Sequence, residues 1–245
     1  MYGNHSQVKD GEPRVDPIYR SLYRIGGVAA ALEVIVTVLH SGIFFVVGLP
    51  SDILEWFELF NSSPLSGLLA FESLLVVYVI LSIPLSLALY AALHHENVSL
   101  MSLYLALSLF GAAAFVVSRP GFEMLSLSHA YATAASDAQR AVYLAAGEAM
   151  LAVFGGTAYW VSYILGSISG LIISVVILRG GIFSKPTGYF RFASSIFDFG
   201  IFVPTVGLFI ALISVFCLMG FNILVSRRLL QFGSGGYVDR AGGDA

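Results

Sequence analysis

Charged side chains are scarce in this sequence. Only 11% of its 245 residues are Asp, Glu, Lys or Arg, and 58% are hydrophobic, whereas a soluble domain carries about 25% charged residues. The formal net charge is only -3, and no basic patch of the kind that binds nucleic acid stands out. The single cysteine, Cys217, cannot form an intramolecular disulfide. The composition therefore excludes an ordinary soluble domain, a disulfide-stapled scaffold and a nucleic-acid partner.

Recognisable catalytic motifs are also lacking. The sequence contains no phosphate-binding loop, dinucleotide fingerprint or haem-attachment motif. His95 begins a segment that starts like the zinc motif H-E-x-x-H, but Ser99 stands where the second histidine must be. Ser128, His129 and Asp137 supply the residue types of a hydrolytic triad without a nucleophile turn or an oxyanion hole. We therefore expect no cofactor and no metal ion, and the sequence does not favour an enzyme.

Long apolar runs are what the sequence has instead of charge. Runs of about 18 apolar residues or more indicate helices that cross a membrane. Six runs, the fifth of them short, cover residues 25–48, 65–93, 98–117, 157–178, 187–203 and the stretch that follows the turn at 204–207 and ends near 225. The pattern predicts an all-α fold, a polytopic membrane bundle of six transmembrane helices over residues 21–232, with outer interfacial helices. Residues 1–20 and 233–245 are predicted to be disordered cytoplasmic tails.

The basic residues predict the orientation of this bundle. If the six runs cross in alternation, ten of the twelve Lys and Arg residues fall on one side, and only Arg119 and Arg140 do not. Basic segments are retained on the cytoplasmic side of a membrane, so both termini are expected to be cytoplasmic. The ten are Lys9, Arg14, Arg20, Arg24, Arg179, Lys185, Arg191, Arg227, Arg228 and Arg240.

An amphipathic segment at residues 51–61 follows the first run. In a helix, its Trp56, Phe57 and Phe60 lie on one side, whereas its two glutamates lie elsewhere. Such a segment fits a helix that lies in the outer interface of the membrane. A loop helix packed on the bundle explains the pattern equally well, and both interpretations remain open.

The stretch 141–178 is too long for one span. A single helix of that length would extend about 57 Å, nearly twice the thickness of the hydrocarbon core. Gly155-Gly156 is the natural place for a break. We therefore predict a helix near 138–154 on or near the outer surface, followed by the fourth span. One long tilted helix that protrudes outward is the alternative.

A stripe of small residues follows the fourth span at intervals of four. Small side chains at this spacing allow another helix to approach closely. Packing within the chain is the simpler interpretation, and a homodimer interface, or one with another membrane protein, is the alternative. The stripe consists of Ser162, Gly166, Gly170 and Ser174.

Ionisable residues inside the predicted spans form the candidate site. An ionised side chain at mid-bilayer costs about 2.5 kcal/mol or more, so such groups face the bundle interior or find partners. Helix rise places His40 and Glu72 at similar depths, about 12 and 10 Å below the outer surface. Asp198 and Glu148 also fall near the outer side, and Glu33 alone lies in the inner half. We predict an outward-facing polar pocket built on a His40–Glu72 pair, with Asp198 nearby and Glu148 as a possible member.

Two explanations of this pocket remain open. It is either a proton-titratable or cation-binding site, or a structural hydrogen-bond network that fixes how the helices pack. The first belongs to a transporter, and the second to a membrane protein that serves as a scaffold.

Segments in the second half of the chain resemble a known family. The segment 135–179 and the stretch that follows it carry GEAMLAVFGGTA, VSYILGSISGLIIS, FSKPTGY and VPTVG. With them the chain resembles the uncharacterised prokaryotic membrane-protein family named domain of unknown function 4386, over about residues 19–233. The resemblance implies a six-span helical protein of a bacterial or archaeal membrane. It implies no activity, and it brings no catalytic residues.

The predicted function follows from these features. We expect an integral protein of a prokaryotic plasma membrane, in contact with the lipid bilayer, that acts as a non-enzymatic structural or partner-binding subunit. A small-solute or proton-coupled transporter is the alternative, and an intramembrane hydrolase comes last.

Overall fold

Helices make up all the regular secondary structure of the computed structural model, which describes residues 15–47 and 50–235. The all-α prediction is confirmed. The elements in chain order are the 3-10 turn η1 (Pro17–Tyr19), α1 (Arg20–Val47), α2 (Ile53–Ser62), α3 (Pro64–Ala70), α4 (Ser73–Leu93), α5 (Val98–Val117), α6 (Gly121–Ala132), α7 (Asp137–Phe154), α8 (Thr157–Arg179), α9 (Lys185–Asp198), the 3-10 turn η2 (Phe199–Phe202) and α10 (Gly207–Gly233). The predicted tails lie mostly outside the described residues.

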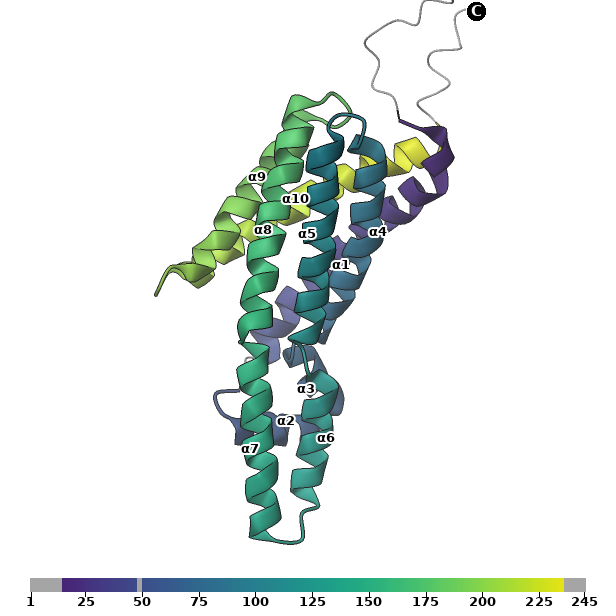
Figure 1. Ribbon diagram of the computed structural model, residues 1–245. Helices are drawn as coiled ribbons and strands as arrows, with labels where there is room; N and C mark the ends of the chain where they lie inside the picture. The colour runs from purple at the N-terminus through teal and green to yellow at the C-terminus, as the bar shows by residue number, and fades with distance from the viewer. Residues whose placement is uncertain (1–14, 48–49, 236–245) are drawn as a thin grey trace, which may run out of the picture.

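Six of these helices form a bundle: α1, α4, α5, α8, α9 and α10. Helix α1 packs on α4 and α10, α8 packs on α5 and α9, and α9 packs on α10. Figure 1 shows the bundle as its upper part, with the start of α1, the α4–α5 and α8–α9 turns and the end of α10 all at the upper end. We call this the basic end. The described basic residues there are Arg20, Arg24, Arg179, Lys185, Arg227 and Arg228.

Five helical segments are long and apolar enough to cross a membrane. They are Pro17–Ile43, Ser73–Leu93, Val98–Ala132, Asp137–Arg179 and Leu212–Gly233. Five of the six predicted spans therefore have a matching helix. The fifth predicted span, 187–203, corresponds to α9, which has only 14 residues and three charged ones (Lys185, Arg191 and Asp198), and to η2. Because a span needs about 20 apolar residues, α9 alone does not qualify.

The second predicted span, 65–93, is not one helix. The structure divides it into α3 and α4 because the backbone of Glu72 adopts the left-handed conformation, with φ 61° and ψ 26°. A non-glycine residue seldom takes this conformation. The polar residue that the sequence placed inside a span therefore lies at a break between two helices.

The other four helices, α2, α3, α6 and α7, form a head beyond the opposite end of the bundle (Figure 1). Helix α2 packs on α3, α6 and α7. Its aromatic face is inside the head, since Trp56, Phe57 and Phe60 are at most 5% exposed. Of the two interpretations of the segment 51–61, the packed loop helix therefore agrees with the structure. The core of the head consists of Ile53, Trp56, Phe57, Phe60, Ala70, Phe71 and Met124.

The predicted break at Gly155-Gly156 is confirmed, because α7 ends at Phe154 and α8 begins at Thr157. Figure 1 shows α7 extending along the line of α8, and α6 along the line of α5. The 43 residues of Asp137–Arg179 correspond to a rod of about 65 Å. This is more than twice the roughly 30 Å of a hydrocarbon core. Helix α7 thus projects away from the bundle instead of lying along its surface.

Side-chain caps are found at the starts of several helices, among them α2, α5 and α7. Asp52 Oδ1 accepts hydrogen bonds from the backbone N–H groups of Leu54 and Glu55, at 2.8 and 3.0 Å, where α2 begins. Asn97 Oδ1 accepts one from Leu100 at the start of α5, and Ser136 Oγ accepts one at the start of α7. Such caps satisfy N–H groups that the first turn of a helix leaves free. These caps therefore mark the turns that precede α2, α5 and α7.

Candidate functional site

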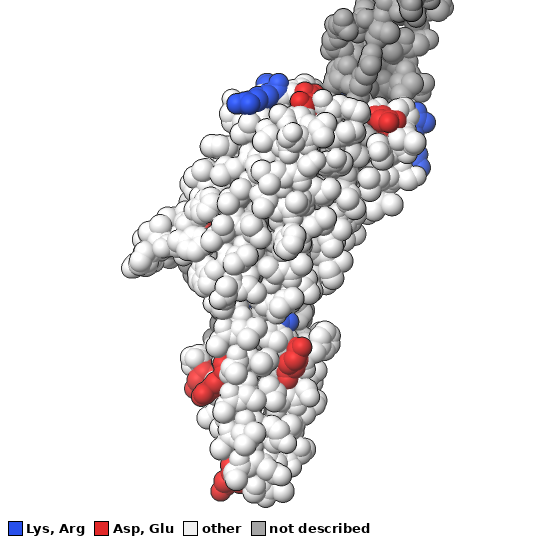
Figure 2. All heavy atoms as spheres, in the orientation of Figure 1, with Lys and Arg blue, Asp and Glu red and all other residues white. Residues whose placement is uncertain are grey.

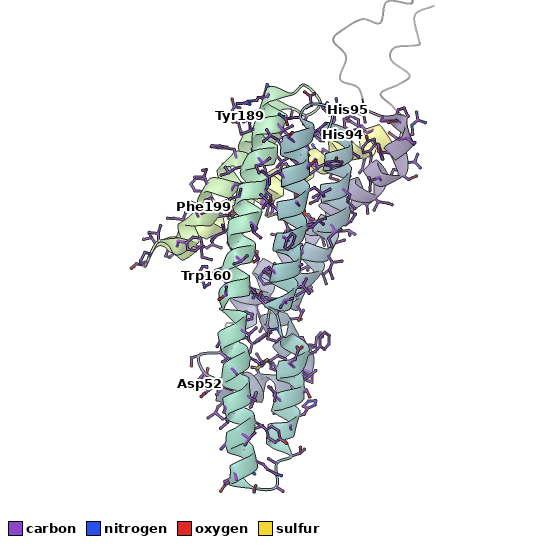
Figure 3. All side chains as sticks on the ribbon, viewed as in Figure 1. Asp52, His94, His95, Trp160, Tyr189 and Phe199 are labelled. Atoms are coloured by element: carbon purple, nitrogen blue, oxygen red, sulfur yellow. The ribbon has the colours of Figure 1, made fainter. Side chains whose placement is uncertain are left out.

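The described ionisable residues lie in four places along the molecule: the basic end, the interior of the bundle, the junction with the head, and the head itself. Figure 2 shows Lys and Arg together with some acidic residues at the basic end, acidic residues on the head, and an almost uncharged band between them. Figure 3 gives two reference points, with His94 and His95 at the basic end and Asp52 on the head. The described ionisable residues between the basic end and the head are buried or half-buried. They form two groups, one at the junction with the head and one inside the bundle.

The outer pair, Glu72 and Arg119, lies at the junction between bundle and head. Arg119 Nε and Nη2 both lie 2.8 Å from Glu72 Oε2, and the residue is only 8% exposed. Its Nη1 donates to the carbonyl of Phe154 at 2.9 Å. The guanidinium carbon also lies 4.3–4.5 Å from the ring centres of Phe115, Phe154 and Tyr159. Arg119 therefore joins the α3–α4 break, the α5–α6 turn and the α7–α8 turn.

Arg119 was one of the two basic residues that did not fall on the predicted cytoplasmic side. Its burial explains this exception. It lies between helices and is neutralised by a carboxylate 47 residues away in the chain. No signal in the sequence pointed to this pair beyond the presence of one cation and one anion near the outer ends of neighbouring runs. The predicted partner of Glu72 was His40. Glu72 binds Arg119 instead.

His40 remains without a hydrogen-bond partner on its buried Nδ1 atom. Glu72 and Arg119 both act on it electrostatically, so it lies close to the outer pair without joining it. Asp198 is elsewhere, where it accepts a hydrogen bond from the hydroxyl of Ser214 between α9 and α10. Glu148 is exposed on α7 in the head. The four predicted residues therefore do not form one hydrogen-bonded site, and Glu148 is not inside the bundle.

The inner cluster, Glu33, Tyr78 and Asn222, lies among α1, α4 and α10. Asn222 Nδ2 donates to Glu33 Oε2 at 2.8 Å and approaches the Tyr78 hydroxyl oxygen at 3.4 Å. Glu33 and Asn222 are 1% and 2% exposed. Glu33 Oε1 and Asn222 Oδ1 are buried and have no hydrogen-bond partner. Buried polar atoms in native proteins nearly always have partners, so two neighbouring exceptions mark this cluster as unusual.

Arg191 lies near the inner cluster and not at the basic end. The sequence counted it among the cytoplasmic residues, but it is half-buried in α9, where Nη2 donates to the carbonyl of Gly166 at 3.3 Å. Its guanidinium carbon is 5.6 Å from the ring centre of Phe221, and it acts electrostatically on both Glu33 and Asp198. No ion pair within 4 Å links it to either carboxylate, although all three residues are described.

The small-residue stripe faces the chain's own helices. A Cβ atom on Gly170 would overlap Ser195 Oγ of α9 and lie 2.5 Å from Arg191 Nη2. The Cβ of an Ala at Gly111 of α5 would lie 3.4 Å from the carbonyl of Ser162. Ser162, Gly170 and Ser174 are buried, and Gly166 is half-buried. The stripe therefore packs within the chain, which agrees with the simpler interpretation.

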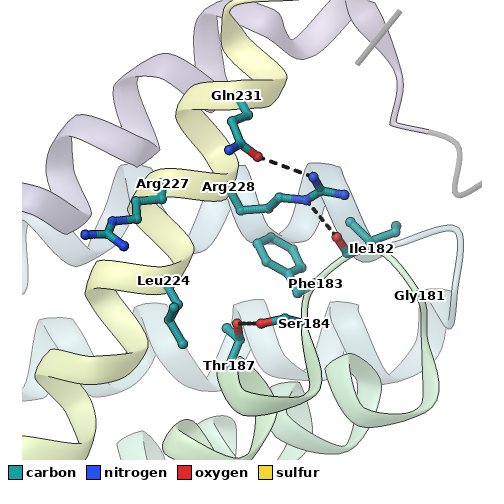
Figure 4. Close-up of a pocket in the computed structure, with 9 residues that line it drawn as sticks. All are labelled: Gly181, Ile182, Phe183, Ser184, Thr187, Leu224, Arg227, Arg228 and Gln231. Atoms are coloured by element: carbon teal, nitrogen blue, oxygen red, sulfur yellow. Dashed lines mark hydrogen bonds between the residues drawn. The ribbon is translucent and has the colours of Figure 1, made fainter. Parts of the chain in front are cut away.

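A pocket lies at the basic end, away from both groups (Figure 4). It has a volume of about 350 Å³, and one side chain on its wall, Arg228, donates from Nε to the carbonyl of Ile182 at 3.0 Å. A smaller pocket of about 80 Å³ lies nearby. The wall of the larger pocket contains two arginines, which could accommodate a small anion. The residues that line this pocket are Gly181, Ile182, Phe183, Ser184, Thr187, Leu224, Arg227, Arg228 and Gln231.

Residues considered for catalysis do not come together. The hydroxyl of Ser128 is buried and donates to the carbonyl of Leu125 at 2.8 Å, whereas His129 and Asp137 are exposed. His94 uses Nδ1 to bond the carbonyl of Ala91 at 3.0 Å. Among residues 15–47 and 50–235, no group of three or more His, Cys, Asp or Glu residues could hold a metal ion.

Comparison with known proteins identifies no relative. No protein-family model matches the chain, and no curated protein or solved structure matches it. The resemblance to the family named domain of unknown function 4386 therefore stays a prediction. The function has to be inferred from the geometry of this chain.

Proposed function

We propose that this chain is an integral protein of a prokaryotic plasma membrane and acts as a non-enzymatic, partner-binding subunit. In this proposal the bundle crosses the bilayer six times, and both termini are cytoplasmic. Helix α9 and η2 together form the short fifth span. The head then projects on the outer side and binds a partner there. We also propose membership of the family that the sequence resembles.

The observation that carries this proposal is the projecting head with a core of its own. Helix α7 alone is 18 residues long, or about 27 Å, and it continues beyond a span that α8 already completes. The aromatic side chains that α2 contributes are buried against α6 and α7 rather than directed to lipid. A preformed surface binds a partner without the entropic penalty of ordering a loop.

The charge of the head indicates the chemistry of the partner. Its described residues include six exposed carboxylates and one exposed guanidinium, that of Arg140, which gives a net charge of -5 with His129 neutral. Complementary charge steers association and selects partners. We infer that the partner presents a positively charged surface. The carboxylates are those of Asp52, Glu55, Glu58, Glu123, Asp137 and Glu148.

Photo-crosslinking in the native membrane tests this function, and the chain offers a matched pair of positions. Phe122 on α6 is 75% exposed, and Phe110 on α5 is 73% exposed. We expect a benzophenone side chain at Phe122 to give a discrete protein adduct that disappears when Glu55, Glu58 and Glu123 are changed to Gln. The same probe at Phe110 should react with lipid. Adducts that are identical at both positions, or that ignore the three carboxylates, would contradict the proposal.

A small-solute or proton-coupled transporter is the second candidate. It is supported by the ionisable groups inside the bundle, namely the buried Glu33 and the half-buried Arg191 and Asp198, because such groups in a membrane often belong to ion pathways. Purified protein in liposomes with an internal pH-sensitive dye tests it. Acidification that requires both the protein and a solute gradient would favour the transporter over the partner-binding subunit.

A further inference from the structure

We propose that the inner cluster is a proton-binding site. In this proposal, Glu33 is a neutral carboxylic acid at pH 7, and its Oε1–H group donates a hydrogen bond to Asn222 Oδ1. The proposal concerns the bundle and does not depend on what the head binds.

The first argument comes from the atoms that lack partners. Asn222 Nδ2 already donates to Glu33 Oε2, and the atoms left over on these same two groups are Glu33 Oε1 and Asn222 Oδ1. An ionised carboxylate and an amide carbonyl are both acceptors, so neither can satisfy the other. One proton on Glu33 turns Oε1 into a donor. The acid and the amide then form a ring of two hydrogen bonds, and both unsatisfied atoms acquire a partner.

The second argument comes from the balance of charge. Inside the bundle, the described ionisable acids and bases near the cluster are two carboxyl groups, Glu33 and Asp198, and one guanidinium, Arg191. Arginine does not lose its proton in proteins. If both acids were ionised, the bundle interior would carry an uncompensated negative charge in a low-dielectric setting, which is strongly unfavourable. One of the two acids is therefore expected to hold a proton.

The third argument assigns that proton to Glu33. Asp198 accepts a hydrogen bond from the hydroxyl of Ser214, which supports its charged form. Glu33 Oε2 accepts from the amide of Asn222, and the Tyr78 hydroxyl also hydrogen-bonds the carboxyl group, but Glu33 Oε1 receives no donor. Asp198 is thus the better partner for the charge of Arg191, and Glu33 is the better place for the proton.

Four neighbouring helices contribute polar or charged groups to the surroundings of Glu33. Helix α4 contributes Tyr78, α10 contributes Asn222, and α9 contributes Arg191, while Tyr104 of α5 lies within electrostatic range. A divalent cation in place of the proton would require about six oxygen ligands. Only two oxygen atoms of the inner cluster lack a hydrogen bond. The cluster therefore fits a proton better than a metal ion.

Infrared spectroscopy of the full chain in lipid nanodiscs tests the proposal. We expect the carbonyl band of a neutral carboxylic acid at pH 7, and we expect it to shift when glutamate, but not aspartate, carries a ¹³C label at its carboxyl carbon. Glu33→Gln should abolish this band, whereas Glu58→Gln, which changes an exposed acid of the head, should leave it unchanged.

Several results would overturn the proposal. These are a wild-type protein without the band, a band that shifts with labelled aspartate, and a band that survives Glu33→Gln. Loss of the wild-type band when NaCl replaces choline chloride would indicate a sodium site instead. The isotope measurement uses the unaltered protein, so the absence of a glutamate band would overturn the proposal even if Glu33→Gln does not fold.

Discussion

The head and the bundle place their charged side chains in opposite ways. The head buries Trp56, Phe57 and Phe60 and exposes all of its described carboxylates. The bundle exposes large apolar side chains such as Phe110 and Phe216, which are 73% and 72% exposed, and it keeps its inner ionisable groups buried or half-buried. Water favours the first arrangement, and lipid favours the second. One chain of low overall charge thus contains one part that is suited to water and one part that is suited to lipid.

The two parts meet at the outer pair. Arg119 contacts Glu72 at the α3–α4 break, Phe115 of α5 and residues of α7 and α8 at once. A single side chain therefore connects α5, α7 and α8 with the break that precedes α4. A buried ion pair adds little stability compared with apolar residues, but loss of one partner is strongly destabilising. The outer pair is therefore where the difference between head and bundle can be disrupted most strongly.

The largest effect is expected for Arg119→Leu. This change leaves the carboxylate of Glu72 without its partner and should lower the free energy of unfolding by about 3–5 kcal/mol. Thermal unfolding of the purified protein in detergent measures the loss. Adding Glu72→Gln should restore part of it, because the unpaired charge is then removed. Wild-type stability of the single variant would show that the pair does not hold the head in place.

Phe57→Ala tests whether the head has a core of its own. Phe57 is 1% exposed, and loss of a buried Phe side chain costs about 3–5 kcal/mol. The matched change in the bundle is Phe110→Ala, whose side chain is 73% exposed, and its effect should stay within about 0.5 kcal/mol. Trp56 fluorescence in a Trp160→Phe background reports on the head, since the chain has two tryptophans. Equal effects of the two changes would remove the contrast between the parts.

Gly170→Ala tests the packing of the bundle at a smaller scale. Its new Cβ would overlap Ser195 Oγ, and overpacking of this kind costs about 1–3 kcal/mol. Gly166→Ala is the control on the same helix, because no atom lies within 4 Å of the Cβ position there. Thermal unfolding should therefore separate two identical substitutions four residues apart. If both are neutral, α9 does not pack on α8 as described.

The smallest effect is expected on the surface of the head. Glu58→Lys reverses an exposed charge and should change the free energy of unfolding by no more than about 0.5 kcal/mol. The same change should weaken adducts from a photo-crosslinker at Phe122. A large loss of stability would mean that Glu58 has a structural role that its exposure does not suggest.

Features set by neighbouring residues could be predicted from the sequence. Two adjacent glycines marked the break between α7 and α8, and five of the apolar runs correspond to long helices. The aromatic side of α2 was visible as well. Its environment was not, because the same pattern suits lipid and a protein core.

Features set by distant residues could not be predicted. Glu72 and Arg119 are 47 positions apart, and Glu33 and Asn222 are 189 apart, so no local pattern joins them. The depth estimate placed His40 and Glu72 at similar heights, but depth does not choose a partner. The charge pattern assigned Arg191 to a basic turn. Arg191 is the seventh residue of α9, and at that position the helix is already inside the bundle.

The central claim is that the bundle lies in the membrane and the head outside it on the non-cytoplasmic side. Labelling of single-cysteine variants with a membrane-impermeant maleimide tests it, in intact cells and in a Cys217→Ala background. We predict labelling for Ala138→Cys on the head, none for Phe110→Cys, and labelling for Gln231→Cys only after the cells are opened. Labelling of Phe110→Cys or Gln231→Cys in intact cells would contradict the claim.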